Sequence, residues 1–100
     1  MCNPVSHRRL ARLVSVELRD HVAQDRQFTA YDVTCSLRSN HPDIYIAHDT
    51  TRELVHRYMR NVLGSGRYQA GWADFGDKVA VLYAPMPTLT FLQIPPLARN

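Results

Sequence analysis

The stretch from residue 28 to residue 83 places two helix-like segments before a glycine-containing hairpin, and this order restricts the fold more than any other feature of the chain. Each helix-like segment begins near residues that favour helix N-caps, and the second ends at a Gly-Ser-Gly triplet. Two strand-like runs around a short polar loop follow. The sequence therefore predicts an α+β domain whose main strands lie toward the C-terminal end of the chain, after the helices.

A further helix is predicted before this stretch, from Val5 to Gln24, with Ser6 as a plausible N-cap. Its apolar stripe has helical spacing and consists of Leu10, Val14, Leu18 and Val22. The basic residues off this stripe are Arg8, Arg9, Arg12 and Arg19. They form either a solvated basic face or a surface that touches phosphate groups.

The next helix is predicted within Gln27–Asn40. Thr29 and Asp32 have the spacing of a capping box, with aspartate in the position usually held by glutamate. Val33 and Leu37 share the face predicted to be buried. Proline disfavours helical conformation in the residue before it, so the helix is expected to end ahead of residue 42.

The linker that follows, Asp43–Ala47, alternates in hydrophobicity and contains β-branched residues. We therefore expect a short strand at Ile44–Ile46, and we expect this strand to pair with the hairpin.

A third helix is predicted over Thr50–Leu63. Thr50 and Glu53 have strict capping-box spacing, and Asp49 is an alternative cap. Its apolar stripe consists of Leu54, Val55, Tyr58, Met59 and Val62. The side chains expected to face solvent on one edge are those of Arg52, His56 and Arg60. Gly64 or Gly66 is expected to supply a left-handed C-cap.

The hairpin is predicted from Arg67–Trp72 and Lys78–Tyr83, joined by the loop Ala73–Asp77. A glycine in this loop suits a positive φ angle. The loop also carries two aspartates, and Phe75 at its tip is expected to be exposed.

This order of elements resembles the winged helix-turn-helix, with three helices and a C-terminal β-hairpin wing. The resemblance implies a DNA-binding protein, such as a transcriptional regulator or accessory factor that acts by occupying a site on double-stranded DNA. It makes the third helix the recognition helix. The residues it assigns to DNA are Thr50, Thr51, Arg52, His56, Arg57 and Arg60. Arg52 and His56 would lie near bases, and Arg57 and Arg60 on phosphates. The linker before this helix is longer than in a compact helix-turn-helix, and the acidic wing tip differs from wings that clamp DNA.

An alternative assigns the same architecture to protein–protein interaction or self-assembly through the wing and the C-terminal segment. In that case Glu53 pairs with Arg57 along the helix, and the other charges serve solubility.

The chain divides into a winged-helix-like domain, residues 1–84, and an extended, proline-flanked apolar tail, residues 85–100. Successive side chains of a strand point to opposite faces, so the apolar residues of the tail need two surfaces to cover them. The tail is therefore expected to form a homo-oligomer interface through Leu89, Phe91, Leu92 and Ile94.

Composition limits the kinds of partner and the classes of protein that fit this chain. The formal net charge is +3, and all basic residues except Lys78 are arginines, which suits a polyanionic partner. Cys2 and Cys35 are far apart and indicate two free thiols in a cytoplasmic protein. No apolar run has the length of a membrane span, and no enzyme motif, metal-ligand spacing, cofactor motif or small-molecule site is evident. Cys35 is expected to be buried in the core, and the alternative is a thiol–imidazole pair of Cys35 with His41 or His48.

Overall fold

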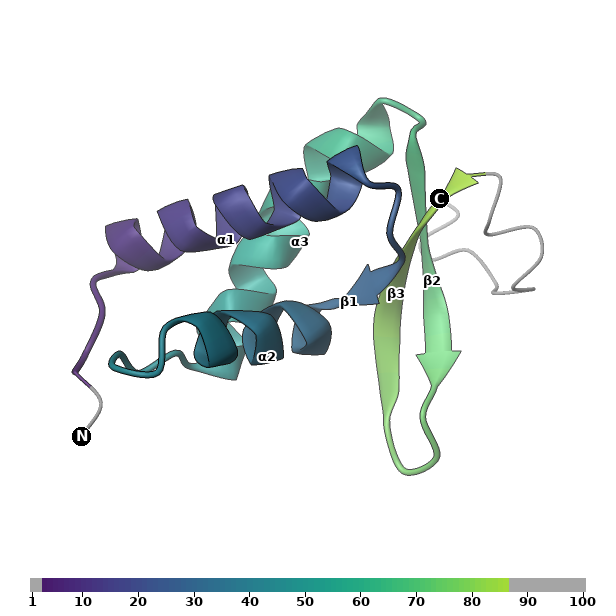
Figure 1. Ribbon diagram of the computed structural model, residues 1–100. Helices are drawn as coiled ribbons and strands as arrows, with labels where there is room; N and C mark the ends of the chain where they lie inside the picture. The colour runs from purple at the N-terminus through teal and green to yellow at the C-terminus, as the bar shows by residue number, and fades with distance from the viewer. Residues whose placement is uncertain (1–2, 87–100) are drawn as a thin grey trace.

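The computed structural model describes residues 3–86, which form three helices and a three-stranded antiparallel sheet (Figure 1). The helices are α1 (His7–Ala23), α2 (Ala30–Asn40) and α3 (His48–Gly64). The strands are β1 (Phe28–Thr29), β2 (Tyr68–Asp74) and β3 (Val79–Pro85), arranged in the order β1-β3-β2. The α+β class expected from the sequence is confirmed.

Helix α1 begins where its cap was expected. The Ser6 Oγ accepts a hydrogen bond from the Arg9 backbone N–H at 3.1 Å, which satisfies one of the free amides of the first turn. Leu10, Val14 and Leu18 are buried along one stripe, as their spacing predicted.

Helix α2 has the capping box that the sequence predicted. The Asp32 backbone N–H donates to Thr29 Oγ1 at 3.2 Å, and the Thr29 N–H donates to Asp32 Oδ2 at 2.9 Å. Val33 and Leu37 enter the core, whereas Cys35 is exposed, so the expectation of a buried Cys35 was wrong. His48 hydrogen-bonds Thr34 Oγ1 through Nδ1 at 2.8 Å rather than serving a thiol–imidazole pair.

The small strand that pairs with the hairpin is β1, and the prediction that Ile44–Ile46 would do so was wrong. Phe28 lies opposite Tyr83 on β3. Ile44 forms only an isolated parallel bridge with Asn3, the first of the described residues. A two-residue strand directly before a helix cap carries too little alternation to be detected in the sequence.

Helix α3 begins two residues earlier than predicted, and its start has no side-chain cap. Ala47 is the N-cap, so the expected capping box of Thr50 and Glu53 is not formed. At the other end, the helix runs through Gly64, and Gly66 takes the positive φ of 81° that the sequence assigned to one of the two glycines.

The hairpin strands are each longer than predicted, and the register pairs Trp72 with Val81 and Asp74 with Val79. The turn is closed by the Phe75 N–H, which donates to the Lys78 carbonyl at 2.8 Å. Gly76 in this turn has a φ of 89°, a conformation that other residues rarely adopt. The tip of the hairpin extends beyond the helices (Figure 1).

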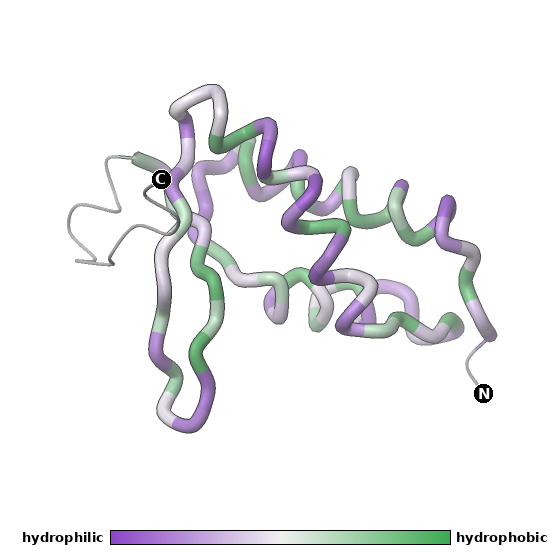
Figure 2. Tube along the Cα trace, turned by 180° about the vertical axis from the view of Figure 1, so that it is seen from behind, coloured by the Kyte–Doolittle hydropathy of each residue, from purple (hydrophilic) through white to green (hydrophobic). Residues whose placement is uncertain are grey.

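One face of the hairpin closes the core against the helices. Tyr68 and Tyr83 are buried on this face, and the Phe28 ring lies 5.5 Å from the Tyr83 ring and 6.2 Å from the Tyr68 ring. Because directly paired residues share a face and every second residue repeats it, Trp72 and Val81 lie on this same face, closer to the tip. Figure 2 shows the apolar stretch of β3 leading to a hydrophilic tip.

The tail residues predicted to form an oligomer interface lie outside the described residues. The proposed boundary after residue 84 falls within β3, which continues through Pro85.

Candidate functional site

Helix α3 carries three exposed arginines, Arg52, Arg57 and Arg60. Helical spacing places Arg57 and Arg60 on the side away from the buried Val55 and Met59, whereas Arg52 lies on the edge of the helix nearer the hairpin. The Arg52 guanidinium lies 3.6 Å from Asp49 Oδ1, and both side chains are more than half exposed. Within residues 3–86, Arg57 and Arg60 have no acidic group in ion-pair contact, so their charges are available to a partner.

The apolar side of α3 agrees with its prediction. Leu54, Val55 and Met59 are buried. Tyr58 and Val62 are partly buried and pack against the same core.

The two threonines of the first turn differ from the expectation. Thr51 is fully buried, and its hydroxyl donates to the Ala47 carbonyl at 2.8 Å, so it cannot reach an external partner from this position. Thr50 is partly buried. The accessible part of the predicted DNA-binding set is therefore formed mainly by the arginines.

His56 does not face solvent as expected. It is half-buried, and its Nδ1 hydrogen-bonds the hydroxyl of Tyr83 on β3. Burial lowers the pKa of His56, and the nearby Arg52 lowers this pKa further. Burial raises the pKa of Tyr83 to about 12. A neutral histidine therefore joins α3 to the hairpin at ordinary pH.

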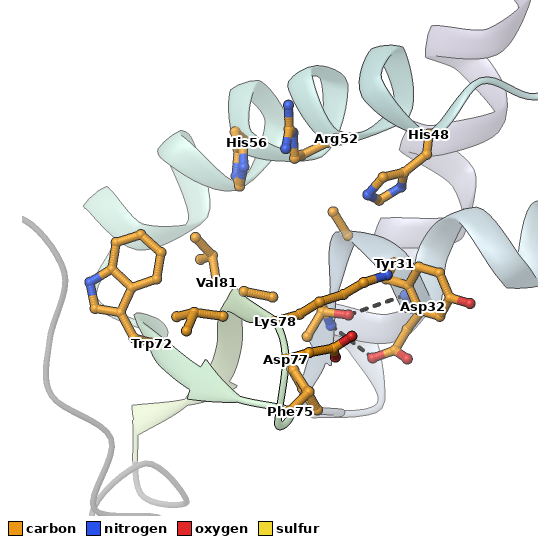
Figure 3. Close-up of a pocket in the computed structure, with 14 residues that line it drawn as sticks. Tyr31, Asp32, His48, Arg52, His56, Trp72, Phe75, Asp77, Lys78 and Val81 are labelled. Carbon is orange, nitrogen blue, oxygen red and sulfur yellow. Dashed lines mark hydrogen bonds between the residues drawn. The ribbon is translucent and has the colours of Figure 1, made fainter.

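A groove of about 890 Å³ separates the α3 surface from the hairpin (Figure 3). His48, Arg52 and His56 line the helix side, and Trp72 and Val81 line the opposite side. The start of α2 contributes residues at one end of the groove, and the hairpin turn contributes Phe75, Asp77 and Lys78.

Aromatic side chains are the component of this groove that the sequence did not indicate. Tyr31, Trp72 and Phe75 all line it and are all at least half exposed. Lys78 Nζ lies 5.8 Å from the centre of the Tyr31 ring, which is within cation–π range. The sequence did contain one signal for Trp72, because its even spacing from Tyr68 places both side chains on one face of β2. The sequence does not show how far this face extends past the helices, because that depends on the tertiary packing.

The arginines predicted on α1 are also exposed, but none of them lines the groove. The sequence therefore predicted two separate basic surfaces, one on α1 and one on α3. Only the basic surface on α3 adjoins the groove beside the hairpin.

No group of three or more histidine, cysteine, aspartate or glutamate side chains within residues 3–86 is arranged to hold a metal ion. None of the helices formed by those residues combines the length and hydrophobicity needed to cross a bilayer.

Comparisons with protein-family models, with curated proteins and with solved structures give no match for this chain.

Proposed function

We propose that this protein is a winged-helix DNA-binding protein that acts by occupying a site on double-stranded DNA. The helix order, the strand order β1-β3-β2 and the short β1 before α2 are compatible with a winged helix. In this proposal α3 enters the major groove, and the β2–β3 hairpin is the wing.

The exposed arginine face of α3 is the observation that carries the proposal. Arg52, in the second turn, would contact base edges. Arg57 and Arg60 would contact phosphates, because neither is engaged by an acid among the described residues. His56 would hold the helix against the hairpin rather than contact DNA, since its ring is bonded to Tyr83.

Binding of random duplex DNA across a salt series tests the proposal. The two phosphate contacts assigned to Arg57 and Arg60 predict a log–log salt slope of about −1.8, at about 0.9 for each neutralised phosphate. Arg57→Gln and Arg60→Gln should each flatten the slope by about 0.9. Arg19→Gln on α1 is the matched control, because it removes an exposed arginine outside α3.

Duplex binding with no change in either α3 variant, but a reduced slope in Arg19→Gln, would move the DNA surface to α1. No duplex binding at low salt would refute the proposed function. On a selected site, Arg52→Ala should lose about 1–3 kcal/mol and relax base preference.

A second candidate, protein–protein interaction through the hairpin, is favoured by the turn at its tip. Phe75 is exposed there between Asp74 and Asp77, and these two carboxylates outnumber the one cation of the turn, Lys78. Such a tip suits a protein surface better than the closely spaced phosphates of a DNA duplex. This role is compatible with DNA binding through α3.

Self-association through the tail remains part of the proposal. A chain shortened after Met86 should have a lower mass by light scattering than the full chain, which we expect to be a two-fold dimer. A full chain that is monomeric at high micromolar concentration would exclude this dimer.

A further inference from the structure

Exposed apolar side chains are concentrated on the groove between α3 and the hairpin. Tyr31, Trp72, Phe75 and Val79 line it, with exposed fractions of 56%, 50%, 58% and 63%. Single exposed apolar residues are ordinary on protein surfaces, but several gathered on one concave surface mark a binding site.

The two sides of the groove differ in chemistry. The hairpin side presents the planar indole of Trp72 and the apolar side chain of Val81, while the α3 side presents Arg52 and two imidazoles. Figure 3 shows Trp72 and Val81 beneath the helix that carries Arg52 and His56. A suitable ligand has a flat apolar face on one side and an anionic or hydrogen-bonding group on the other.

The charges in the groove are nearly balanced. Arg52 and Lys78 are opposed by Asp32 and Asp77. Asp32 is held at the start of α2, where its Oδ2 accepts the Thr29 N–H, and Asp77 belongs to the hairpin turn. The permanent charges sum to about zero, so the groove cannot hold a ligand by charge alone. Stacking on the aromatic rings has to supply much of the affinity.

A single nucleic-acid strand has this combination of groups. Each nucleotide offers a flat base that stacks on an aromatic ring and one phosphate that a cation can contact. In a duplex the base faces are covered by their neighbours, so a duplex cannot use the exposed Trp72 ring in this way.

We propose that this groove binds single-stranded nucleic acid, with a base stacked on Trp72 and neighbouring phosphates contacted by Arg52 and Lys78. This site goes beyond the proposed duplex function, because it uses the hairpin side of α3 and does not need Arg57 or Arg60. Either DNA or RNA supplies the required base and phosphate.

Intrinsic fluorescence provides a direct test, because Trp72 is the only tryptophan in the chain. Unlabelled oligonucleotides of about 15 nucleotides, one of deoxythymidine and one of uridine, are titrated into the full chain. Saturable quenching is expected, since a stacked base contacts the indole directly. Two phosphate contacts predict a log–log salt slope of about −1.4, at about 0.7 for each phosphate of a single strand. The two oligonucleotides distinguish DNA from RNA as the preferred strand.

Variants separate this site from the duplex surface, with binding followed by the anisotropy of a labelled oligonucleotide. Trp72→Leu should weaken single-strand binding at least about five-fold, while duplex binding changes less than about two-fold. Arg60→Gln should have the opposite pattern. Tyr45→Leu is the matched control, because it removes an aromatic ring of similar exposure from the linker before α3.

The proposal is overturned if neither oligonucleotide quenches Trp72, or if Trp72→Leu binds single strands as tightly as Tyr45→Leu. Quenching by duplex alone would also overturn it. Arg52→Gln, which leaves the aromatic side intact, should weaken single-strand binding and provides an independent check if Trp72→Leu folds poorly. Loss of duplex binding alone would refute the proposed function and leave this site standing.

Discussion

A single side chain caps the start of α2 but none caps the start of α3, so the two predicted capping boxes differ in outcome. Thr29 makes its cap bonds, whereas Thr50 lies inside α3 and caps nothing. Both threonines have an acidic residue three positions later, so the spacing alone could not show which of the two capping boxes forms. The chain turns into α3 two residues before Thr50, with Ala47 in the cap position.

Replacing each threonine by alanine tests this difference. Thr29→Ala should lower the free energy of unfolding by about 1–2 kcal/mol, because it leaves an amide of α2 without its acceptor. Thr50→Ala should change it by less than about 0.5 kcal/mol, since alanine favours helix interiors. Urea unfolding measures both values. A larger loss in Thr50→Ala would show that Thr50 caps the helix in solution.

His56 should make stability dependent on pH. Its lowered pKa means that the unfolded chain binds a proton near pH 6.5, while the folded chain does so only at lower pH. The unfolded state therefore holds more protons in that interval. This part of the stability is present above about pH 6.5 and is lost as the pH falls through the folded pKa.

The matched variant is His56→Gln, whose amide oxygen can still accept a hydrogen bond from the Tyr83 hydroxyl. The wild-type chain should lose more stability than this variant between about pH 7.5 and about pH 5 in urea unfolding. Equal losses in both proteins would mean that His56 is not the titrating group.

At the scale of the elements, the helices were predictable because their information is local. The stripe of Leu10, Val14 and Leu18 and the α2 capping box each lie within a few turns of sequence. The position of β1 was not predictable, because two residues carry no periodicity and their pairing with Tyr83 spans more than half the chain. Ile44–Ile46 has the stronger local strand pattern, but Ile44 and Ile46 are buried without joining the sheet.

Helix α1 offers a controlled test of burial with one residue type. Val14 is 1% exposed and Val16 is 56% exposed on the same helix. Val14→Ala should cost about 2 kcal/mol, because it removes two buried methyl groups and leaves a cavity. Val16→Ala should cost less than about 0.5 kcal/mol. Thermal and urea unfolding compare them, and similar costs would contradict the packing of α1 described above.

At the scale of the whole molecule, the candidate site arises where separate elements meet. The sequence placed Arg52, Arg57 and Arg60 correctly on the exposed side of α3. It did not indicate that His56 would turn toward Tyr83, or that Trp72 would stand across a groove from Arg52. These relations depend on how the hairpin packs against the helices, which no local pattern specifies.

Exposed arginines lie on both α1 and α3, and the arrangement of the neighbouring elements distinguishes the two surfaces. The α3 surface adjoins the groove and the hairpin, so a partner there gains contacts from several elements. None of the residues that line the groove belongs to α1, so a partner on the α1 surface would not gain these contacts. This asymmetry supports the proposal that DNA binds at α3 and not at α1.

Mapping the duplex contact by NMR tests that assignment most directly. Random duplex DNA is titrated into isotope-labelled protein at low salt, and backbone amide shifts are followed. We expect the largest changes at Arg52, Arg57 and Arg60 and their exposed neighbours on α3. Changes confined to residues 7–19 of α1, or no changes at any duplex concentration, would refute DNA binding through α3.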